Sequence, residues 1–196
     1  MRRFVLVLVL ILTPALGRAA APEDAVAAVK KTLDAALEIA GRSGTRDEKL
    51  VALRAVARDI LDTRSMGRRA IGEVLAAQPP EQQAEFLDLF DQVMVRAYLQ
   101  KLLLFRSPRL GYREPQTKGQ AVIVGTKIIT TTDDYKVDYE MRERDGRWVA
   151  TDVIVEGISL TENYRAQFAS LLRDRSFAEL LDLMRRKTHP AREEPM

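Results

Sequence analysis

The spacing of hydrophobic residues changes once along this chain of 196 residues, and that change restricts the fold more than any other feature. From Glu23 to about Phe105 the hydrophobic residues recur every three or four positions, which is the period of an amphipathic helix. After Ser107 and Pro108 they alternate with polar residues, which is the period of a strand with one buried face. Helices and strands that are grouped in this way predict an α+β fold.

Four helices are predicted before residue 105. The first spans Glu23 to Ala40, the second opens at the capping box of Thr45 and Glu48, and the third runs from about Thr63 to Ala77. The fourth begins after Pro80 and is the most regular, because its hydrophobic residues form one continuous stripe. The stripe consists of Phe86, Leu89, Phe90, Val93, Met94, Ala97, Tyr98 and Leu102.

Strands are predicted around residues 110–114 and over 120–131, 136–142 and 147–156. Asp145-Gly146 is a hairpin signal, and the last two strands have no room for a crossover helix between them, so we expect an antiparallel meander. Two short helices with capping-box patterns at Ser159 and Ser176 close the chain. The expected architecture is a curved antiparallel sheet of about four strands with helices packed on one face.

The N-terminus is typical of a secretory signal peptide. Two arginines precede an apolar run from Phe4 to Leu12, and small residues follow it. Thr13 and Pro14 break this run before it reaches the roughly 20 apolar residues of a bilayer span, so an uncleaved anchor is the less favoured alternative. We predict a signal peptide over residues 1–19 with cleavage between 17 and 21, a single domain over 22–187, and a disordered tail over 188–196.

The basic isoelectric point of about 9.3 suggests an anionic partner such as nucleic acid. Residues 1–19, however, carry three arginines and no acid, so their removal leaves 28 basic and 28 acidic residues. Strong attraction to phosphate requires a surplus or a dense patch of Lys and Arg. The remaining cluster, at residues 185–187, is typical of a solvated helix end. Nucleic-acid binding is therefore disfavoured.

Most catalytic chemistries are excluded by composition. The chain has no cysteine, which rules out disulfides, Cys-ligated metals and thiol nucleophiles. Its single histidine, His189, excludes metal sites built on paired histidines. No Gly-rich nucleotide-binding loop occurs. We therefore predict neither a metal nor a cofactor.

Carboxylates remain as candidates for acid–base chemistry. Asp152, Glu156 and Glu162 flank Tyr164 and Arg165 at a predicted strand–helix junction. Ion pairing and helix capping are the favoured interpretation, because structural ion pairs outnumber catalytic ones. A small-molecule enzyme on a cone-shaped α+β fold, using Asp152 or Glu156, is the alternative.

Binding of an apolar ligand is a second candidate function. Hydrophobic stripes on the long helix, the strands and the closing helix all face the interior of the predicted fold. Such stripes are usually filled core, and the same residues also suit the wall of a ligand pocket. The pattern alone leaves both interpretations open.

Two stretches of the sequence resemble the MlaC family, the periplasmic lipid-binding proteins also known as toluene-tolerance ABC-transporter auxiliary components. The more specific stretch runs from Trp148 to Phe168, and the other is the long-helix motif from Pro80 to Tyr98. The resemblance extends from about Ala25 to Leu183. Its motifs are Val137-Asp-Tyr-Glu-Met, Gly146-Arg-Trp148, Asp152-Val-Ile-Val-Glu156-Gly157-Ile-Ser159-Leu160, Asn163-Tyr164-Arg165-Ala-Gln167-Phe168, and Pro80-Glu-Gln82-Gln-Ala-Glu85-Phe86. The family commonly has an aromatic residue where this chain has Thr151.

The resemblance implies a freely diffusing periplasmic carrier that takes phospholipid between an inner-membrane MCE-protein/ABC transporter complex and an outer-membrane lipoprotein complex, maintaining outer-membrane lipid asymmetry. A hopanoid-associated carrier of the same family is an alternative. The acyl-chain pocket would lie between sheet and helices, with Glu156, Tyr164 and Arg165 at its mouth. The expected pocket residues are Phe86, Phe90, Val93, Met94, Tyr98, Val122, Val124, Tyr139, Met141, Val153, Tyr164 and Phe168.

Overall fold

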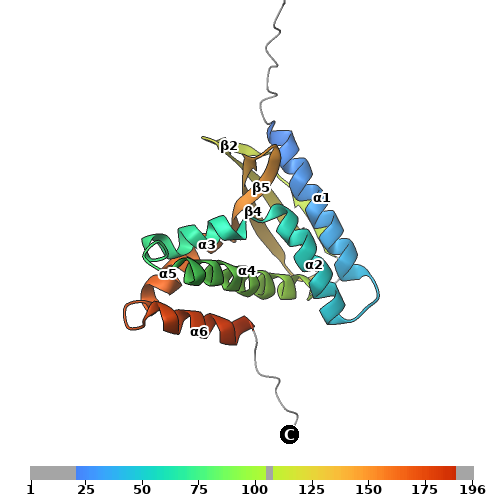
Figure 1. Cartoon of the computed structure of the whole chain (residues 1–196). Helices are drawn as coiled ribbons and strands as arrows, with labels where there is room; N and C mark the ends of the chain where they lie inside the picture. Colours follow the sequence, from blue (N-terminus) through green and yellow to red (C-terminus); the bar gives the residue numbers. More distant parts are fainter. Residues whose placement is uncertain (1–20, 105–107, 189–196) are drawn as a thin grey trace, which may run out of the picture.

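The computed structural model describes residues 21–104 and 108–188, and Figure 1 shows their arrangement. The predicted signal peptide lies outside the described residues, as do positions 189–196 of the predicted tail, whereas Thr188 is the last residue of a helix. None of the described helices is long and apolar enough to cross a membrane. The helices are α1 (Pro22–Gly41), α2 (Arg46–Ile60), α3 (Thr63–Ile71), the 3-10 turn η1 (Gly72–Val74), α4 (Pro80–Leu102), α5 (Leu160–Leu171) and α6 (Phe177–Thr188).

The helix ends follow the capping chemistry of the sequence. Thr45 and Glu48 form both hydrogen bonds of the predicted capping box at the start of α2. Pro22 and Pro80 occupy the first turns of α1 and α4, where a missing N–H costs nothing. The prediction for α3 was too long, because Gly72 adopts a positive φ of 67° and ends the helix before residue 77.

The sheet is antiparallel, and its central strands form the predicted meander. β3, β4 and β5 pair in sequence order, and the turn between β4 and β5 has positive φ angles at Asp145 and Gly146, as a two-residue hairpin requires. The sheet has six strands, not about four. The strands are β1 (Arg109–Tyr112), β2 (Gln116–Lys118), β3 (Ala121–Ile129), β4 (Asp134–Arg144), β5 (Arg147–Val155) and β6 (Ile158–Ser159).

The additional strands are short pieces at the two edges of the sheet. β1 and β2 both pair with β3, so they act as one edge strand interrupted near Pro115, which has no N–H to donate. β6 pairs with the end of β5 at the opposite edge and leads directly into α5.

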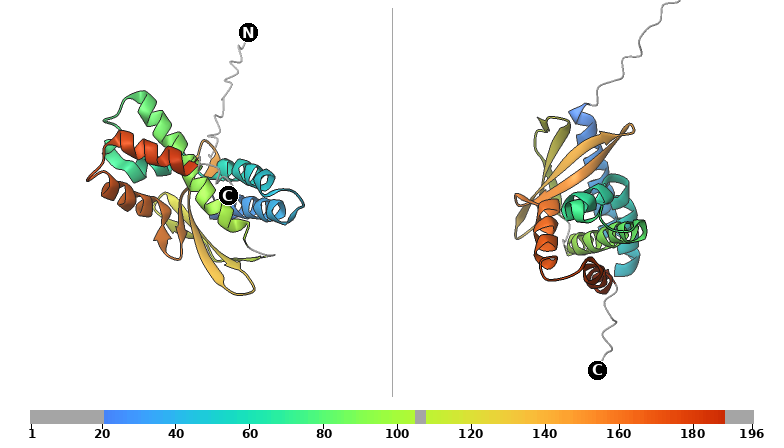
Figure 2. Two further views of the ribbon diagram at one scale, coloured as in Figure 1. Left: turned by 90° about the horizontal axis from the view of Figure 1, so that it is seen from below. Right: turned by 60° about the vertical axis from the view of Figure 1, so that its left-hand side comes forward.

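The helices cover one face of the sheet, as predicted. The register places Val124 beside Tyr139 and Tyr139 beside Val153, so these side chains share the helix-covered face. Figure 2, left, shows α1, α2 and α4 on the same side of the strands. The opposite face carries charged residues such as Lys127 and Lys136.

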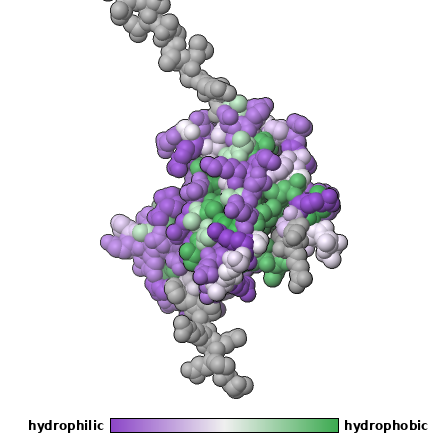
Figure 3. All heavy atoms as spheres, turned by 90° about the vertical axis from the view of Figure 1, so that its right-hand side faces the viewer, coloured by the Kyte–Doolittle hydropathy of each residue, from purple (hydrophilic) through white to green (hydrophobic). Residues whose placement is uncertain are grey.

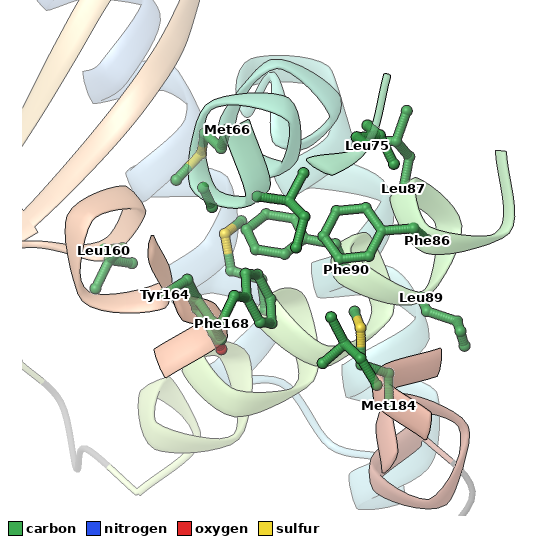
Figure 4. Close-up of a cluster of buried hydrophobic side chains, with 14 of the residues drawn as sticks. Met66, Leu75, Phe86, Leu87, Leu89, Phe90, Leu160, Tyr164, Phe168 and Met184 are labelled. Carbon is green, nitrogen blue, oxygen red and sulfur yellow. The ribbon is translucent and has the colours of Figure 1, made fainter. Parts of the chain in front are cut away.

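The buried residues form three clusters. The largest, which we call the aromatic core, centres on Phe86 and Phe90 of α4 together with rings from α5 and α6. The ring centroids of Phe86 and Phe168 lie 5.5 Å apart, and those of Phe90 and Tyr164 lie 5.1 Å apart, and both pairs are edge to face. Figure 4 shows these side chains pointing toward one another. The other two are the sheet–α1 cluster (Ala25, Val29, Ile60, Val122, Val124, Met141 and Ala150) and the hairpin-tip cluster (Ala36, Ile39 and Leu53).

Candidate functional site

A cavity of about 850 Å³ lies between the α1–α2 hairpin, the second half of α4 and the helix-covered face of the sheet. Its size is within the range of pockets that hold small ligands. Figure 3 shows hydrophobic side chains reaching the surface between hydrophilic regions on the side of the molecule that carries α1 and α2. The lining residues are Thr32, Leu33, Ala36, Leu53, Val56, Ala57, Ile60, Leu61, Met94, Val95, Tyr98, Leu99, Lys101, Leu102, Leu104, Ile128, Thr130, Thr131, Thr132, Tyr135, Val137, Tyr139, Val153, Val155, Glu156 and Leu160.

The α1–α2 hairpin is held at both ends, and the cavity lies under its middle. The end of α2 is tied to the sheet, where the Asp62 N–H donates to the Ala150 carbonyl at 2.9 Å. Near the loop between α1 and α2, Leu53 and its neighbours pack against Leu99 and Leu102 of α4. Between these two attachments the hairpin presents the small side chains of Ala36 and Ala57 to the cavity. Space therefore remains between hairpin and sheet.

The polar atoms of the inner wall are mainly uncharged hydroxyls. Burial raises the pKa of Tyr139 well above its ordinary value, and the nearby Tyr112 adds to this effect. Burial likewise raises the pKa of Tyr98. Tyr98 and Tyr139 therefore keep their protons to higher pH than a free tyrosine, and the wall suits an apolar ligand better than an ionic one.

Charged side chains occur among the lining residues at two positions, Lys101 and Glu156. The Lys101 ammonium lies 5.6 Å from the centre of the Tyr98 ring, within cation–π distance. The Glu156 carboxylate accepts a hydrogen bond from the Lys136 backbone N–H, which fixes it at the end of β5. Both residues are exposed, so they belong to the opening of the cavity.

Asp152 has the structural role that the sequence favoured. Its Oδ1 accepts hydrogen bonds from the Val153 N–H at 2.9 Å and from the Thr161 hydroxyl at 2.9 Å, and its Oδ2 accepts one from the Ser159 hydroxyl. The guanidinium of Arg69 approaches the same carboxylate at 3.8 Å. These bonds join β5 to the start of α5. Asp152 is not among the residues that line the cavity, whereas its neighbour Val153 is.

Four of the twelve expected pocket residues, Met94, Tyr98, Tyr139 and Val153, line the cavity, as does Glu156 of the expected mouth. The other eight lie in the packed clusters, and their contact with lipid stays a prediction. Phe86, Phe90, Val93, Tyr164 and Phe168 belong to or pack against the aromatic core, and Val122, Val124 and Met141 belong to the sheet–α1 cluster.

The expected mouth residues do not lie together on the cavity. Arg165 donates to the backbone carbonyl of Arg69 and pairs with Glu162, and neither it nor Tyr164 lines the cavity. The described residues include no group of three or more that would hold a metal ion.

Sequence reasoning missed the wall formed by α1 and α2. Leu33, Leu53, Val56 and Ile60 belong to the apolar stripes of these helices, so the signal for burial was present. Periodicity identifies the face that is buried. It carries no information on whether a neighbouring side chain fills the space opposite.

Comparisons with known proteins agree on the identity of the fold. Comparison with curated proteins gives no match. Among solved structures, the phospholipid-binding protein from Ralstonia solanacearum, determined in complex with a phospholipid, superposes with a TM-score of 0.76 at 22% identity, covering 84% of this chain and 97% of that one. The family model of the MlaC protein matches residues 26–186. The resemblance found in the sequence is confirmed, and the chain belongs to the MlaC family.

Proposed function

We propose that this protein is a periplasmic lipid carrier whose cavity holds the acyl chains of a phospholipid. The observation that carries the proposal is the apolar cavity of about 850 Å³ inside a member of the MlaC family. An apolar cavity of this kind binds apolar groups in preference to water. The phospholipid-binding description of the similar Ralstonia protein supports the same ligand class.

The energetics favour transfer by direct contact between proteins or with a membrane. Burial of acyl chains stabilises them by about 0.8 kcal/mol per CH₂, so two long chains amount to roughly 20 kcal/mol against water. Release into water is then negligible, because such a free energy lies near the limit of non-covalent affinity. In a bilayer the chains have equally apolar surroundings, so the free energy of their transfer from the cavity to a membrane is close to zero. The carrier must therefore dock to deliver its lipid.

The proposed route runs between an inner-membrane MCE-protein/ABC transporter complex and an outer-membrane lipoprotein complex, with maintenance of outer-membrane lipid asymmetry as its result. Membership of the MlaC family supports these partners. The predicted signal peptide supports the periplasmic location, since export places the mature chain between the two membranes.

A binding role is favoured over the enzyme alternative. Every oxygen of Asp152 is engaged in joining β5 to α5, which leaves this carboxylate no position for acid–base chemistry on a ligand in the cavity. Glu156 reaches the cavity without a second acid beside it among the lining residues. Catalysis by a carboxylate pair is therefore disfavoured.

The test is to fill the cavity from α2. Ala57 is buried and lines the cavity, so Ala57→Trp would occupy the space assigned to acyl chains. Ala55 lies on the exposed side of the same helix and provides the matched control, Ala55→Trp. Lipid would be extracted from each purified full-length protein and quantified by mass spectrometry, which also distinguishes diacyl lipids from hopanoids.

The expected result is lipid bound to the wild type and to Ala55→Trp, and at least a tenfold loss in Ala57→Trp, about 1.4 kcal/mol or more of binding free energy. Circular dichroism checks that each variant is folded, and Ala36→Phe, from α1 of the same hairpin, is the substitute if Ala57→Trp is not. Equal lipid content in wild type and a folded cavity-filling variant would overturn the proposal.

A further inference from the structure

The three walls of the cavity are held in place by different kinds of contact. The sheet wall belongs to a continuous antiparallel ladder, in which β3, β4 and β5 are joined along their length by backbone hydrogen bonds. The wall from α4 is fixed by the aromatic core and by ion pairs to neighbouring helices, such as that of Glu85 with Arg185 of α6 at 2.6 Å. The α1–α2 hairpin is the third wall (Figure 1), and its attachments differ between its base and its tip.

The base of the hairpin is anchored on both of its helices. Ala25 and Val29 of α1 are buried against the sheet in the sheet–α1 cluster. At the end of α2, the buried Asp91 of α4 accepts hydrogen bonds from the Arg58 guanidinium at 2.8 Å and from the Thr63 hydroxyl at 2.8 Å. Arg58 lies before the α2–α3 junction and Thr63 lies after it. One carboxylate therefore holds both sides of the junction.

The α2–α3 junction has the features of a hinge. Leu61 and Asp62 are the two residues between the helices, and neither has helical backbone angles. Hinges are typically a few residues at the ends of elements, which absorb the change in φ and ψ. A second, polar pocket of about 530 Å³ lies at the junction and leaves room for the end of α2 to turn. Its lining residues are Arg58, Leu61, Asp62, Thr63, Arg64, Asp88, Asp91 and Gln92.

The tip of the hairpin is attached more weakly than its base. The hairpin-tip cluster has three buried residues, Ala36, Ile39 and Leu53, which pack against half-buried leucines at the end of α4. In the part of the chain that the structure describes, no hydrogen bond or ion pair joins residues 35–54 to α4. A segment with few buried apolar contacts opens locally at lower cost than a hydrogen-bonded sheet or a large core. The tip is therefore the part of the cavity wall that separates most easily.

We infer that the α1–α2 hairpin is the lid of the cavity: its tip parts from the end of α4, its base turns at Leu61 and Asp62, and lipid passes through the gap. The inference rests on the proposed lipid-carrier function and adds the moving wall to it. Ile39 is the latch, because it is buried at the tip and is not among the residues that line the cavity. Asp91 is a positioning residue that keeps the hinge in place.

The first test measures how fast lipid leaves the protein. Full-length protein that carries phosphatidylethanolamine with a fluorescent head group is mixed with vesicles that contain a quencher, and the loss of fluorescence gives the transfer rate. Ile39→Ala is compared with the wild type. Ile71→Ala is the matched control, because Ile71 is equally buried, 6% exposed against 7% for Ile39, and lies in the aromatic core.

Ile39→Ala should accelerate transfer by about tenfold or more, since the truncation destabilises the closed lid and not the open one. Ile71→Ala should transfer lipid at the wild-type rate, although urea denaturation should show a comparable loss of stability. If Ile39→Ala does not fold, Ile39→Val replaces it, with an expected acceleration of about two- to tenfold. A folded Ile39 variant that transfers lipid no faster than Ile71→Ala would overturn the inference.

The second test identifies the wall that moves. The chain has no cysteine, so pairs of spin labels are attached at Arg46→Cys on the hairpin tip, Ala97→Cys on α4 and Lys136→Cys on the sheet. All three positions are exposed and outside the cavity lining. Double electron–electron resonance then gives the three distances in lipid-free and lipid-loaded protein.

Both distances from position 46 should gain a longer population in lipid-free protein, and the distance between positions 97 and 136 should stay the same. A changed distance between 97 and 136, with a constant distance between 46 and 97, would show that the sheet moves instead and would overturn the lid. Three unchanged distances would also overturn it. Protein that takes up no lipid from vesicles would instead overturn the carrier function itself.

Discussion

The aromatic core and the cavity lie on the same helix and against the same face of the sheet, yet one is filled and the other is open. The first half of α4 contributes Phe86 and Phe90, which contact rings from α5 and α6. The second half contributes Tyr98 and Leu102, which face the α1–α2 hairpin across the cavity. A single hydrophobic stripe therefore serves packing at one end and ligand space at the other.

The difference arises from the side chains opposite the stripe. Around Phe86 and Phe90, large rings interdigitate at centroid distances of 5.1 to 6.2 Å. Across the cavity, the hairpin presents the small side chains of Ala36 and Ala57 and no aromatic ring. Whether a hydrophobic face is core or binding site is thus decided by its neighbour.

Truncation of one aromatic residue in each region gives the largest expected contrast. Phe90→Ala should lower the free energy of unfolding by about 3–5 kcal/mol, because it leaves a cavity in packed surroundings. Tyr98→Ala should cost less than about 2 kcal/mol, since this half-buried side chain already borders open space. Urea denaturation of lipid-free protein measures both. Equal losses would show that the two halves of α4 are packed alike.

The second-largest expected contrast is the effect of lipid removal on the stability of the two regions. A ligand present at 100 times its dissociation constant stabilises the folded state by about 2.7 kcal/mol, so delipidated protein should unfold at lower temperature than loaded protein. Hydrogen exchange should locate the change in the α1–α2 hairpin, which borders the cavity, and leave α3 unaffected, since α3 packs on the aromatic core. Faster exchange in α3 than in the hairpin would contradict the assignment.

The smallest effect concerns a tyrosine of the aromatic core. Burial raises the pKa of Tyr164 from 10 to about 12, so the folded protein keeps this phenol protonated where the unfolded chain releases its proton. The resulting stability is fully present below pH 10 and is lost as the pH rises to 12, by about 2 kcal/mol. Denaturation at a series of pH values measures the slope, and Tyr164→Phe should reduce it by the share of Tyr164, while the buried Tyr139 and Tyr98 still contribute. A slope unchanged in Tyr164→Phe would assign it to another group.

Local signals predicted the elements of this fold well. Thr45 with Glu48 predicted the start of α2, Asp145-Gly146 predicted the β4–β5 hairpin, and the change of period predicted the α+β class. The failures came from backbone effects that periodicity does not report, such as the positive φ of Gly72 that ends α3 early.

The site was predicted only in part, for a physical reason. Met94 and Tyr98 were expected at the pocket and line the cavity, whereas Phe90 occupies an equivalent position in the stripe and packs in the aromatic core. Their difference depends on whether α5 or the α1–α2 hairpin lies opposite. That long-range arrangement is set by tertiary packing and leaves no mark on the local sequence.

The most direct test places a photo-crosslinking benzoylphenylalanine at Tyr98, which lines the cavity, and at Ala97, the adjacent exposed position on α4. Each full-length variant is loaded from vesicles of radiolabelled phosphatidylethanolamine, illuminated and resolved by electrophoresis. Because consecutive helical residues point about 100° apart, and Ala97 is exposed and does not line the cavity, labelled lipid should attach to the Tyr98 variant and much less to the Ala97 variant. Attachment at Ala97 alone, or at neither position in protein that carries lipid, would contradict the assignment of the cavity as the lipid site.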